Sequence, residues 1–318
     1  MKIVDAATTE RHLEFGALID ALRTMFADGC EVPLRQVHQI ADRDGAPAGT
    51  VLVMPAWRAG RRFGLKTVMI FPGNGAHGLP GLHSTYLLYD ATTGEPLAQI
   101  DGDQITTRRT AAAAALAASY LARPDARRLL VVGSGRVARL LADAMRAVRP
   151  IDEVIIWNHR RAGAEALAAN LRAAGIAAQA SSDLAASVAA SDIVSCATLS
   201  TAALIEGRWL APGTHLDLIG SFTPQMREAD GACFERARVF VDTTEALAKS
   251  GDLLGAIAEG SFAPAALQGT LADLCAGRIA GRASADEITL FKAVGSALED
   301  LAAAELVFDR LTPQPGGA

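Results

Sequence analysis

Cysteine is scarce in this chain, and its positions give no sign of a disulfide or a zinc site. The 318 residues contain four cysteines. Cys30, Cys196, Cys233 and Cys275 lie far apart, without a C-x-x-C spacing or a neighbouring histidine pair. Structural zinc sites and secreted disulfide frameworks need cysteines at short, regular spacings. The histidines show no metal-ligand spacing either, so we predict no metal site.

Long apolar runs and clusters of positive charge are also missing. The alanine-rich stretch 111–122 is shorter than the roughly 20 residues that span a bilayer. The N-terminal residues Met1–Asp5 lack the charged and apolar regions of a signal peptide. A formal net charge of −5 argues against nucleic acid or an anionic membrane surface as a partner. We expect a cytoplasmic protein whose ligands are small molecules.

The strongest pattern that is present is a glycine turn within residues 127–145, between an apolar strand and a helix. Gly133 permits the tight turn, Gly135 lets the backbone approach a pyrophosphate, and Ala138 keeps the helix close to its strand. The free amides at the helix start would then face the phosphates. The same pattern also arises in ordinary strand-helix turns of alanine-rich chains. As a nucleotide site, the turn would include Ser134, Arg136 and Val137.

A second apolar strand, Val154–Trp157, ends where the adenosine ribose of a bound dinucleotide should lie. At the position where an NAD site places an acidic residue, this chain has Asn158, followed by His159, Arg160 and Arg161. Arginine suits a 2′-phosphate, so we predict NADPH as cofactor, with NADH as the alternative. The other interpretation is a polar, basic start to a surface helix.

The remaining periodicity indicates two domains, and the chain is long enough for them. A helix is predicted at 12–27 and short strands at 32–37, 49–55, 63–71, 84–90 and 96–100, the last two as a hairpin. Further on, strands at 128–132, 153–157, 176–180, 192–197, 215–219 and 238–241 alternate with helices at 136–148, 161–173 and 183–189. That alternation is typical of a doubly wound parallel sheet.

We therefore expect an α/β protein with a Rossmann domain at 113–287. A final helix has Leu298, Leu301 and Leu306 on one face, which suits packing against the first domain. That domain would then be a discontinuous α+β domain formed by residues 1–112 and 288–318. The tail 312–318, rich in proline and glycine, is expected to fray.

Several separate motifs occur in the order typical of one family. They are Arg109–Ala112, the glycine turn, Trp209–Gly213, Gly220–Glu228, Gly251–Leu253 and Phe291–Gly295. With them the chain resembles the ornithine cyclodeaminase/mu-crystallin family over nearly its whole length. The resemblance implies a homodimer whose first domain supplies both the dimer sheet and the substrate pocket. It also implies NAD(P)-linked chemistry on amino and imino acids.

One loop distinguishes the activities within the family. Cyclodeaminases carry an acidic residue two places after the glycine that matches Gly220 and a lysine four places further on, where this chain has Phe222 and Met226. A phenylalanine can neither hold nor deprotonate the distal amino group of a diamine. The loop instead is similar to that of Δ1-pyrroline-2-carboxylate and Δ1-piperideine-2-carboxylate reductases, and we predict an NADPH-dependent ketimine reductase.

Three other activities stay open. They are an alanine-type amino-acid dehydrogenase, an ornithine cyclodeaminase that uses another residue in place of Phe222, and a non-catalytic NADPH-dependent ligand-binding protein. Each would use the same cofactor domain.

The resemblance also assigns residues to the site. Arg35, Lys66 and Arg109 match positions that bind the substrate carboxylate, and Thr85 matches a threonine of the substrate pocket. Lys66 would also pass a proton to the imine nitrogen if neighbouring cations depress its pKa, with His83 as a competing donor. On the cofactor side the matching residues are Arg109, Thr198, Leu199, Ile219 and Ser221. Without the resemblance, the arginines and Lys66 would be interpreted as surface charges, Thr85 and His83 as ordinary polar residues, and the segment with Thr198 and Leu199 as a turn at the end of a strand. The resemblance gives Asp217 no role.

Overall fold

The computed structural model describes residues 1–312 and divides into two compact units. The first unit comprises Met1–Arg109 and the C-terminal segment from Ser296 onward, and the second comprises Thr110–Gly295. The division falls inside helix α3 (Gly102–Leu121), which therefore contributes to both units. Residues 313–318, most of the tail expected to fray, lie outside the described residues.

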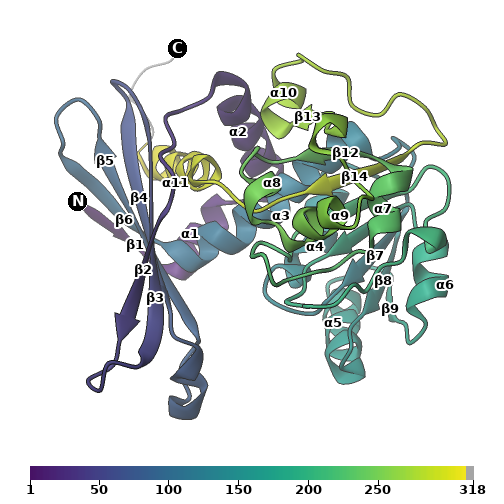
Figure 1. Cartoon of the computed structure of the whole chain (residues 1–318). Helices are drawn as coiled ribbons and strands as arrows, with labels where there is room; N and C mark the ends of the chain where they lie inside the picture. The colour runs from purple at the N-terminus through teal and green to yellow at the C-terminus, as the bar shows by residue number, and fades with distance from the viewer. Residues whose placement is uncertain (313–318) are drawn as a thin grey trace. The chain divides into compact units, whose positions relative to one another are not determined.

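The first unit is built on a six-stranded sheet with the strand order β1-β6-β5-β4-β3-β2. β1 pairs with β6 in parallel, and the other neighbours are antiparallel. In Figure 1, helix α11 is the yellow helix beside this sheet, and it packs against α2, β3 and β4. The elements are β1 (Lys2–Val4), α1 (Ala6–His12), α2 (Phe15–Asp28), β2 (Gln36–Ala41), β3 (Pro47–Arg58), β4 (Arg62–Ile70), η1 (Pro72–His77), β5 (Leu82–Asp90), β6 (Pro96–Asp101) and α11 (Ala297–Leu311).

The two faces of this sheet differ in burial. Along β4, Gly64, Lys66 and Val68 are buried, whereas Leu65 and Thr67 between them are only half-buried. Consecutive residues of a strand point to opposite faces, so one face packs under the helices and the other does not. We call the first, which carries Lys66, the inner face, and the second the outer face.

Most elements predicted for this unit are confirmed. The helix at 12–27 is α2, and the segments 49–55, 63–71, 84–90 and 96–100 correspond to β3, β4, β5 and β6. The strand predicted at 32–37 is wrong, because β2 begins only at Gln36. Pro33 lacks the backbone N–H that a paired strand must donate. The short elements β1 and α1 carry too little periodicity to be predicted.

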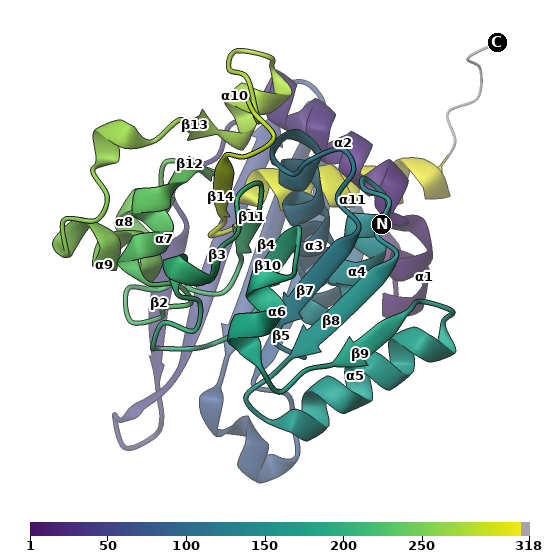
Figure 2. The same ribbon diagram turned by 90° about the vertical axis from the view of Figure 1, so that its right-hand side faces the viewer.

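The second unit contains an eight-stranded parallel sheet with the order β13-β12-β14-β11-β10-β7-β8-β9. Figure 2 shows these strands side by side. Their bounds are β7 (Arg128–Val132), β8 (Glu153–Trp157), β9 (Ala178–Ala180), β10 (Ile193–Cys196), β11 (His215–Leu218), β12 (Ala237–Val241), β13 (Gly269–Thr270) and β14 (Ile288–Lys292). The helices are α4 (Ala138–Arg146), α5 (Arg161–Ala173), α6 (Leu184–Ala189), η2 (Gly207–Trp209), α7 (Gly231–Arg236), α8 (Ala246–Lys249), α9 (Gly251–Ala258), η3 (Pro264–Ala266) and α10 (Leu271–Cys275).

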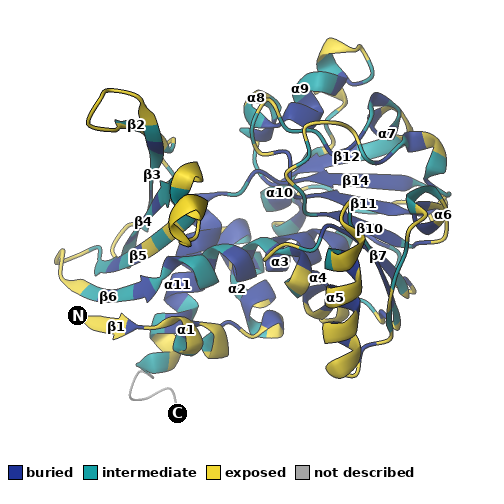
Figure 3. Cartoon of the chain, turned by 90° about the horizontal axis from the view of Figure 1, so that it is seen from below, coloured by how far each residue is buried: buried dark blue, intermediate teal, exposed yellow. Residues whose placement is uncertain are grey.

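The predicted fold class is confirmed, since this is a Rossmann-type doubly wound sheet. The chain runs outward from β7 through β8 to β9, then returns to the other side of β7 with β10 and β11. The central strands are buried along their length (Figure 3), as parallel strands covered on both faces must be. Ligands of such sheets bind at the carboxyl ends of the strands where the order reverses, which here is between β7 and β10.

The domain boundary expected at residue 288 differs from the division in the structure. Ile288–Lys292 forms β14, a fully buried strand inserted between β12 and β11. The second unit therefore continues to Gly295, and the first unit ends at Arg109 rather than at residue 112. A five-residue strand segment next to a helix does not show by itself which sheet it will join.

Candidate active site

Lys66 and Arg109, two of the residues expected to bind substrate, meet in the first unit. Lys66 lies on the inner face of β4, where its neighbours across the sheet are Met54 and Tyr86. Lys66 Nζ is 2.6 Å from Asp300 Oδ2, and the other oxygen of that carboxylate accepts a hydrogen bond from Arg109 Nε at 2.9 Å. The Asp300 carboxylate thus bridges the two cations.

A second carboxylate completes the cluster. Arg109 Nη1 donates to Glu299 Oε2 at 2.7 Å, and Lys66 Nζ also donates to Thr106 Oγ1 at 3.3 Å. Lys66 and Arg109 are thus each paired with an acid from the first turn of α11. Ser296 caps that helix through its hydroxyl, which accepts from Leu298 N, and carboxylates in a first turn are favoured by the helix dipole.

Burial of the cluster changes how its members titrate. Burial, with a smaller effect of nearby Arg109, lowers the pKa of Lys66 to about 8, although Asp300 opposes the shift. Burial alone would raise the pKa of Asp300, but the attraction of Lys66 and Arg109 outweighs it and the pKa falls. Near neutral pH, Asp300 is therefore ionised, and Lys66 can exchange a proton within the physiological range.

Thr85 and His83 do not join Lys66. Lys66 pairs directly with Tyr86 and Thr67 pairs with Thr85, so Thr85 lies on the outer face, and His83, two residues away, lies there too. The structure thus does not bring the expected threonine and the competing proton donor together with Lys66. The register between β4 and β5, which the sequence did not reveal, decides which face each of these side chains lies on.

Arg35 lies at the start of the edge strand β2 of the same sheet. It is half-buried and directly precedes Gln36, which pairs with Val53 on β3. Its backbone is therefore about two strand spacings, roughly 10 Å, from that of Lys66, within reach of an arginine side chain.

In the second unit, the glycine turn has the form of a phosphate loop. Gly133 has φ +116°, and a Cβ there would lie 2.6 Å from Ala197 O, so only glycine fits. A Cβ on Gly135 would meet nothing within 4 Å, which leaves room for a ligand. Helix α4 starts without a side-chain cap, and such a helix start favours an anion.

Two of the residues predicted for the adenosine side lie close together. A Cβ on Gly163 would lie 2.6 Å from Ser134 Oγ and 2.7 Å from Asn158 Nδ2, so Ser134 and Asn158 meet at the start of α5. Arg161 is paired with Glu165 at 2.7 Å. His159 and Arg160 are exposed beyond the carboxyl end of β8, and no acidic residue occupies that end.

The residues expected around the nicotinamide follow β10 and β11. Leu199 is 73% exposed, whereas Ile219 and Ser221 are buried. The hydroxyl of Ser221 donates to Met226 O and accepts from Asp252 N, and Thr198 Oγ1 donates to Glu228. The side chains of Thr198 and Ser221 therefore hold the two loops, and any contact with a cofactor would come from the loop backbones and from Leu199.

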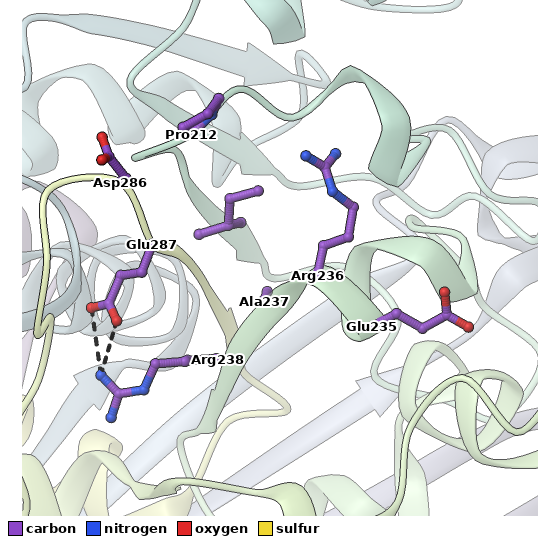
Figure 4. Close-up of a pocket in the computed structure, with 8 residues that line it drawn as sticks. Pro212, Glu235, Arg236, Ala237, Arg238, Asp286 and Glu287 are labelled. Atoms are coloured by element: carbon purple, nitrogen blue, oxygen red, sulfur yellow. Dashed lines mark hydrogen bonds and ion pairs between the residues drawn. The ribbon is translucent and has the colours of Figure 1, made fainter.

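A hollow of about 500 Å³ elsewhere in this unit is not the cofactor site. It is lined by residues at the start of β12 and β14, among them Arg238, which is paired with Glu287 at 3.3 Å (Figure 4). These are the amino ends of the strands, the opposite edge from Gly133 and Thr198. Within residues 1–312, no three His, Cys, Asp or Glu side chains are grouped to hold a metal ion, and no helix is long and apolar enough to cross a membrane.

Sequence reasoning missed the acids that complete both sites. Glu299 and Asp300 lie side by side in the first turn of α11, three and four residues after the capping serine, and that pattern could have marked them. Glu228, Asp252 and Lys292 are likewise fully buried charged residues, within motifs that were noted but given no chemistry.

Comparisons with known proteins agree with this architecture. The model of the ornithine cyclodeaminase/mu-crystallin family matches residues 2–314. The Δ1-pyrroline-2-carboxylate reductase of Paracoccus denitrificans is 42% identical over 293 residues, which are 90% of this chain and 92% of that protein. The enzyme of the same name from Colwellia psychrerythraea is 37% identical over 315 residues, 98% and 99% of the two chains.

Two solved structures have the same fold throughout. The Thermococcus litoralis Δ1-pyrroline-2-carboxylate reductase, in complex with NADH and L-proline, aligns with a TM-score of 0.90 at 30% identity and covers 98% of this chain and 97% of its own. An archaeal alanine dehydrogenase dimer with bound NAD gives a TM-score of 0.90 at 27% identity, with coverage of 100% and 98%.

Proposed function

This chain belongs to the ornithine cyclodeaminase/mu-crystallin family, and we propose that it reduces a cyclic ketimine carboxylate with a nicotinamide cofactor. The products would be L-proline from Δ1-pyrroline-2-carboxylate, L-pipecolate from Δ1-piperideine-2-carboxylate, or both. The observation that carries the proposal is the buried Lys66, whose pKa is lowered to about 8 beside Arg109 and Asp300. Reductases that act on this substrate class are also among the relatives.

The reaction requires the first unit to bind the substrate carboxylate and to donate a proton to the imine nitrogen. Arg109, which Glu299 and Asp300 hold in a fixed orientation, binds the substrate carboxylate, with Arg35 as a second cation. Lys66 Nζ donates a proton to the imine nitrogen, and Asp300 keeps the ammonium group in position for that transfer. When bound, the nicotinamide supplies the hydride to the imine carbon. The C=N bond thereby becomes CH–NH, and Lys66 is left neutral until it takes a proton from water.

The second unit would hold the cofactor through the residues predicted for it. The backbone of Gly133–Val137 and the start of α4 would bind the pyrophosphate, and the loops after β10 and β11 would flank the nicotinamide. We propose NADPH as the preferred form, with Asn158, His159 and Arg160 around the 2′-phosphate. The two solved structures described above contain NADH or NAD. The preference for NADPH therefore rests on the residues of this chain and not on those relatives.

Replacing Arg160 by alanine tests the cofactor preference. A charge-assisted hydrogen bond to phosphate is worth about 1.5–3 kcal/mol, so KM for NADPH should rise roughly 10- to 100-fold while KM for NADH stays the same. Arg172→Ala, at the far end of the same helix, is the matched control, since Arg172 donates to the carbonyl oxygen of Ala178. Equal changes for the two cofactors, or none, would contradict a 2′-phosphate site here.

We also propose that the protein is a homodimer that pairs through the outer face of the first unit's sheet. The uncovered face of an antiparallel sheet is usually polar, but this one carries apolar side chains that are only half-buried: Val51, Val53, Leu65, Met69 and Leu87. A contiguous apolar patch of this kind marks an interface.

A charge in that patch should dissociate the dimer. Leu87→Glu places a carboxylate opposite Leu65, and burying it unpaired would cost several kcal/mol, so sedimentation should show a monomer. Ala166→Glu, on the exposed side of α5, adds the same charge and should leave the dimer intact. A wild-type monomer, or a dimeric Leu87→Glu variant, would show that the interface lies elsewhere.

The activity itself is tested by steady-state rates with five- and six-membered cyclic imines and both cofactors. The proposal expects turnover of at least one imine. Activity only with pyruvate plus ammonia would instead indicate an alanine-type dehydrogenase, as in the structurally similar archaeal enzyme. Proline and ammonia formed from ornithine would indicate a cyclodeaminase, and tight binding of NADPH without turnover would indicate a ligand-binding protein.

A further inference from the structure

A single buried carboxylate, Glu228, joins the two loops that follow β10 and β11. Its Oε1 accepts from the backbone N–H and the hydroxyl of Thr198, both at 2.7 Å, and its Oε2 accepts from Gly220 N at 2.7 Å. β10 and β11 are adjacent parallel strands, and Thr198 and Gly220 each lie two residues beyond the end of one of them. The spacing of the two loops is therefore set by one side chain.

The backbones of both loops pack closely around the Glu228 carboxylate. A Cβ on Gly220 would lie 2.3 Å from Glu228 Oε1 and 2.4 Å from Thr198 O, so the backbone of one loop sits directly against the carboxylate and the other loop. The loop after β10 also contacts the glycine turn. A Cβ on Gly133 would lie 2.6 Å from Ala197 O and 3.4 Å from Thr198 Cγ2. The glycine turn therefore packs against the backbone of the Thr198 loop.

Glu228 is itself held in place by buried charged residues. The amides of Glu228 and Ala229 donate to Asp252 Oδ1 at 2.7 and 3.0 Å. Lys292 Nζ, at the end of β14, lies 3.5 Å from Asp252 Oδ2. The carbonyl oxygen of Glu228 accepts from both Leu204 N and Ile205 N at 2.9 Å. Side chain and backbone are therefore both fixed, which is what a rigid support for a binding site requires.

The hydrogen bonds of the carboxylate suit its ionised form, because its three partners are two N–H groups and one O–H group. Burial raises the pKa of Glu228, and nearby Lys292 and the hydrogen bonds from Thr198 oppose that rise. An amide in the same place would turn one NH₂ group toward a backbone N–H, so one of the two loops would lose its anchor.

We propose that Glu228 is a positioning residue that fixes the two loops around the nicotinamide half of the cofactor, without touching substrate or cofactor itself. The inference rests on the proposed function, because it presumes that a nicotinamide dinucleotide binds at this edge of the sheet. It predicts that the binding of the nicotinamide half of the cofactor depends on Glu228, whereas the binding of the adenosine half does not.

The test compares two ligands on Glu228→Gln. NADPH and 2′-phospho-ADP-ribose differ only by the nicotinamide, and the affinity of each is measured by calorimetry on the full-length protein. The expected result is a Kd for NADPH raised by about tenfold, the loss of roughly one hydrogen bond to a charged group, with the Kd for 2′-phospho-ADP-ribose unchanged. The matched control is Asp217→Asn. Asp217 is an equally buried carboxylate on β11 that accepts from Ser195 Oγ, and both Kd values should then stay as in the wild type.

The outcomes separate the two proposals. If wild-type protein binds neither NADPH nor NADH, the proposed function and this inference both fail. If the wild type binds NADPH, then equal affinities in Glu228→Gln, or equal losses for the two ligands, overturn the inference alone. Should Glu228→Gln not fold, Thr198→Val decides, because it removes the hydroxyl contact with Glu228, together with the 3.2 Å bond that Ser200 N donates to the same hydroxyl, and leaves the carboxylate in place. A weaker loss confined to NADPH supports the role of Glu228, and an unchanged Kd for NADPH rejects it.

Discussion

Lys66→Met is expected to lower kcat for imine reduction by about 10²–10⁴-fold, the usual contribution of a positioned general acid. The change removes the proton donor but leaves Asp300 paired with Arg109, so the folded structure should survive. Lys2→Met is the control, because Lys2 is exposed and donates to the carbonyl oxygen of Leu311. Wild-type kcat in Lys66→Met would remove Lys66 from the mechanism.

The pH profile supplies a second readout of the same residue. Burial lowers the pKa of Lys66 to about 8, so the protonated acid that reduction needs is lost as the pH rises through that value. The rate of reduction should therefore fall above about pH 8, whereas amino-acid oxidation, which needs neutral Lys66 as base, should rise through the same pH. In Lys66→Arg, whose guanidinium stays protonated, the fall near pH 8 should disappear. A fall that persists unchanged would assign it to another group.

Arg109→Met is expected to be the most destabilising of the substitutions considered. Removing one partner of a buried ion pair costs about 3–5 kcal/mol, and Arg109 pairs with both Glu299 and Asp300, which are almost fully buried. The measurement is the free energy of unfolding by denaturant at neutral pH. The same variant should raise KM for the imine, because it lacks the cation proposed to bind the substrate carboxylate.

The double variant Arg109→Met with Glu299→Gln separates these two effects. Removing the charge of Glu299 should recover part of the lost stability, since an uncompensated buried carboxylate no longer remains. KM for the imine should stay as high as in Arg109→Met. If KM recovers together with stability, then Arg109 serves the fold and does not bind substrate.

The amino-acid sequence alone was sufficient for the features that depend on neighbours along the chain. The apolar run before Gly133, the helical spacing after it and the alternating pattern of Phe63–Phe71 are local, and they indicated the parallel sheet, the glycine turn and the antiparallel strands. The motifs also indicated the family, which the comparisons confirm.

Only the tertiary structure decided which residues meet. Strand register placed Lys66 on the inner face and Thr85 on the outer one, and a shift of one residue would have exchanged the two faces. The packing of α11 brought Glu299 and Asp300 to Arg109 and Lys66 and so balanced their charge. Sheet assembly likewise inserted β14 between strands that precede it in the chain. These outcomes depend on contacts between residues far apart in sequence, and local periodicity carries no information about such contacts.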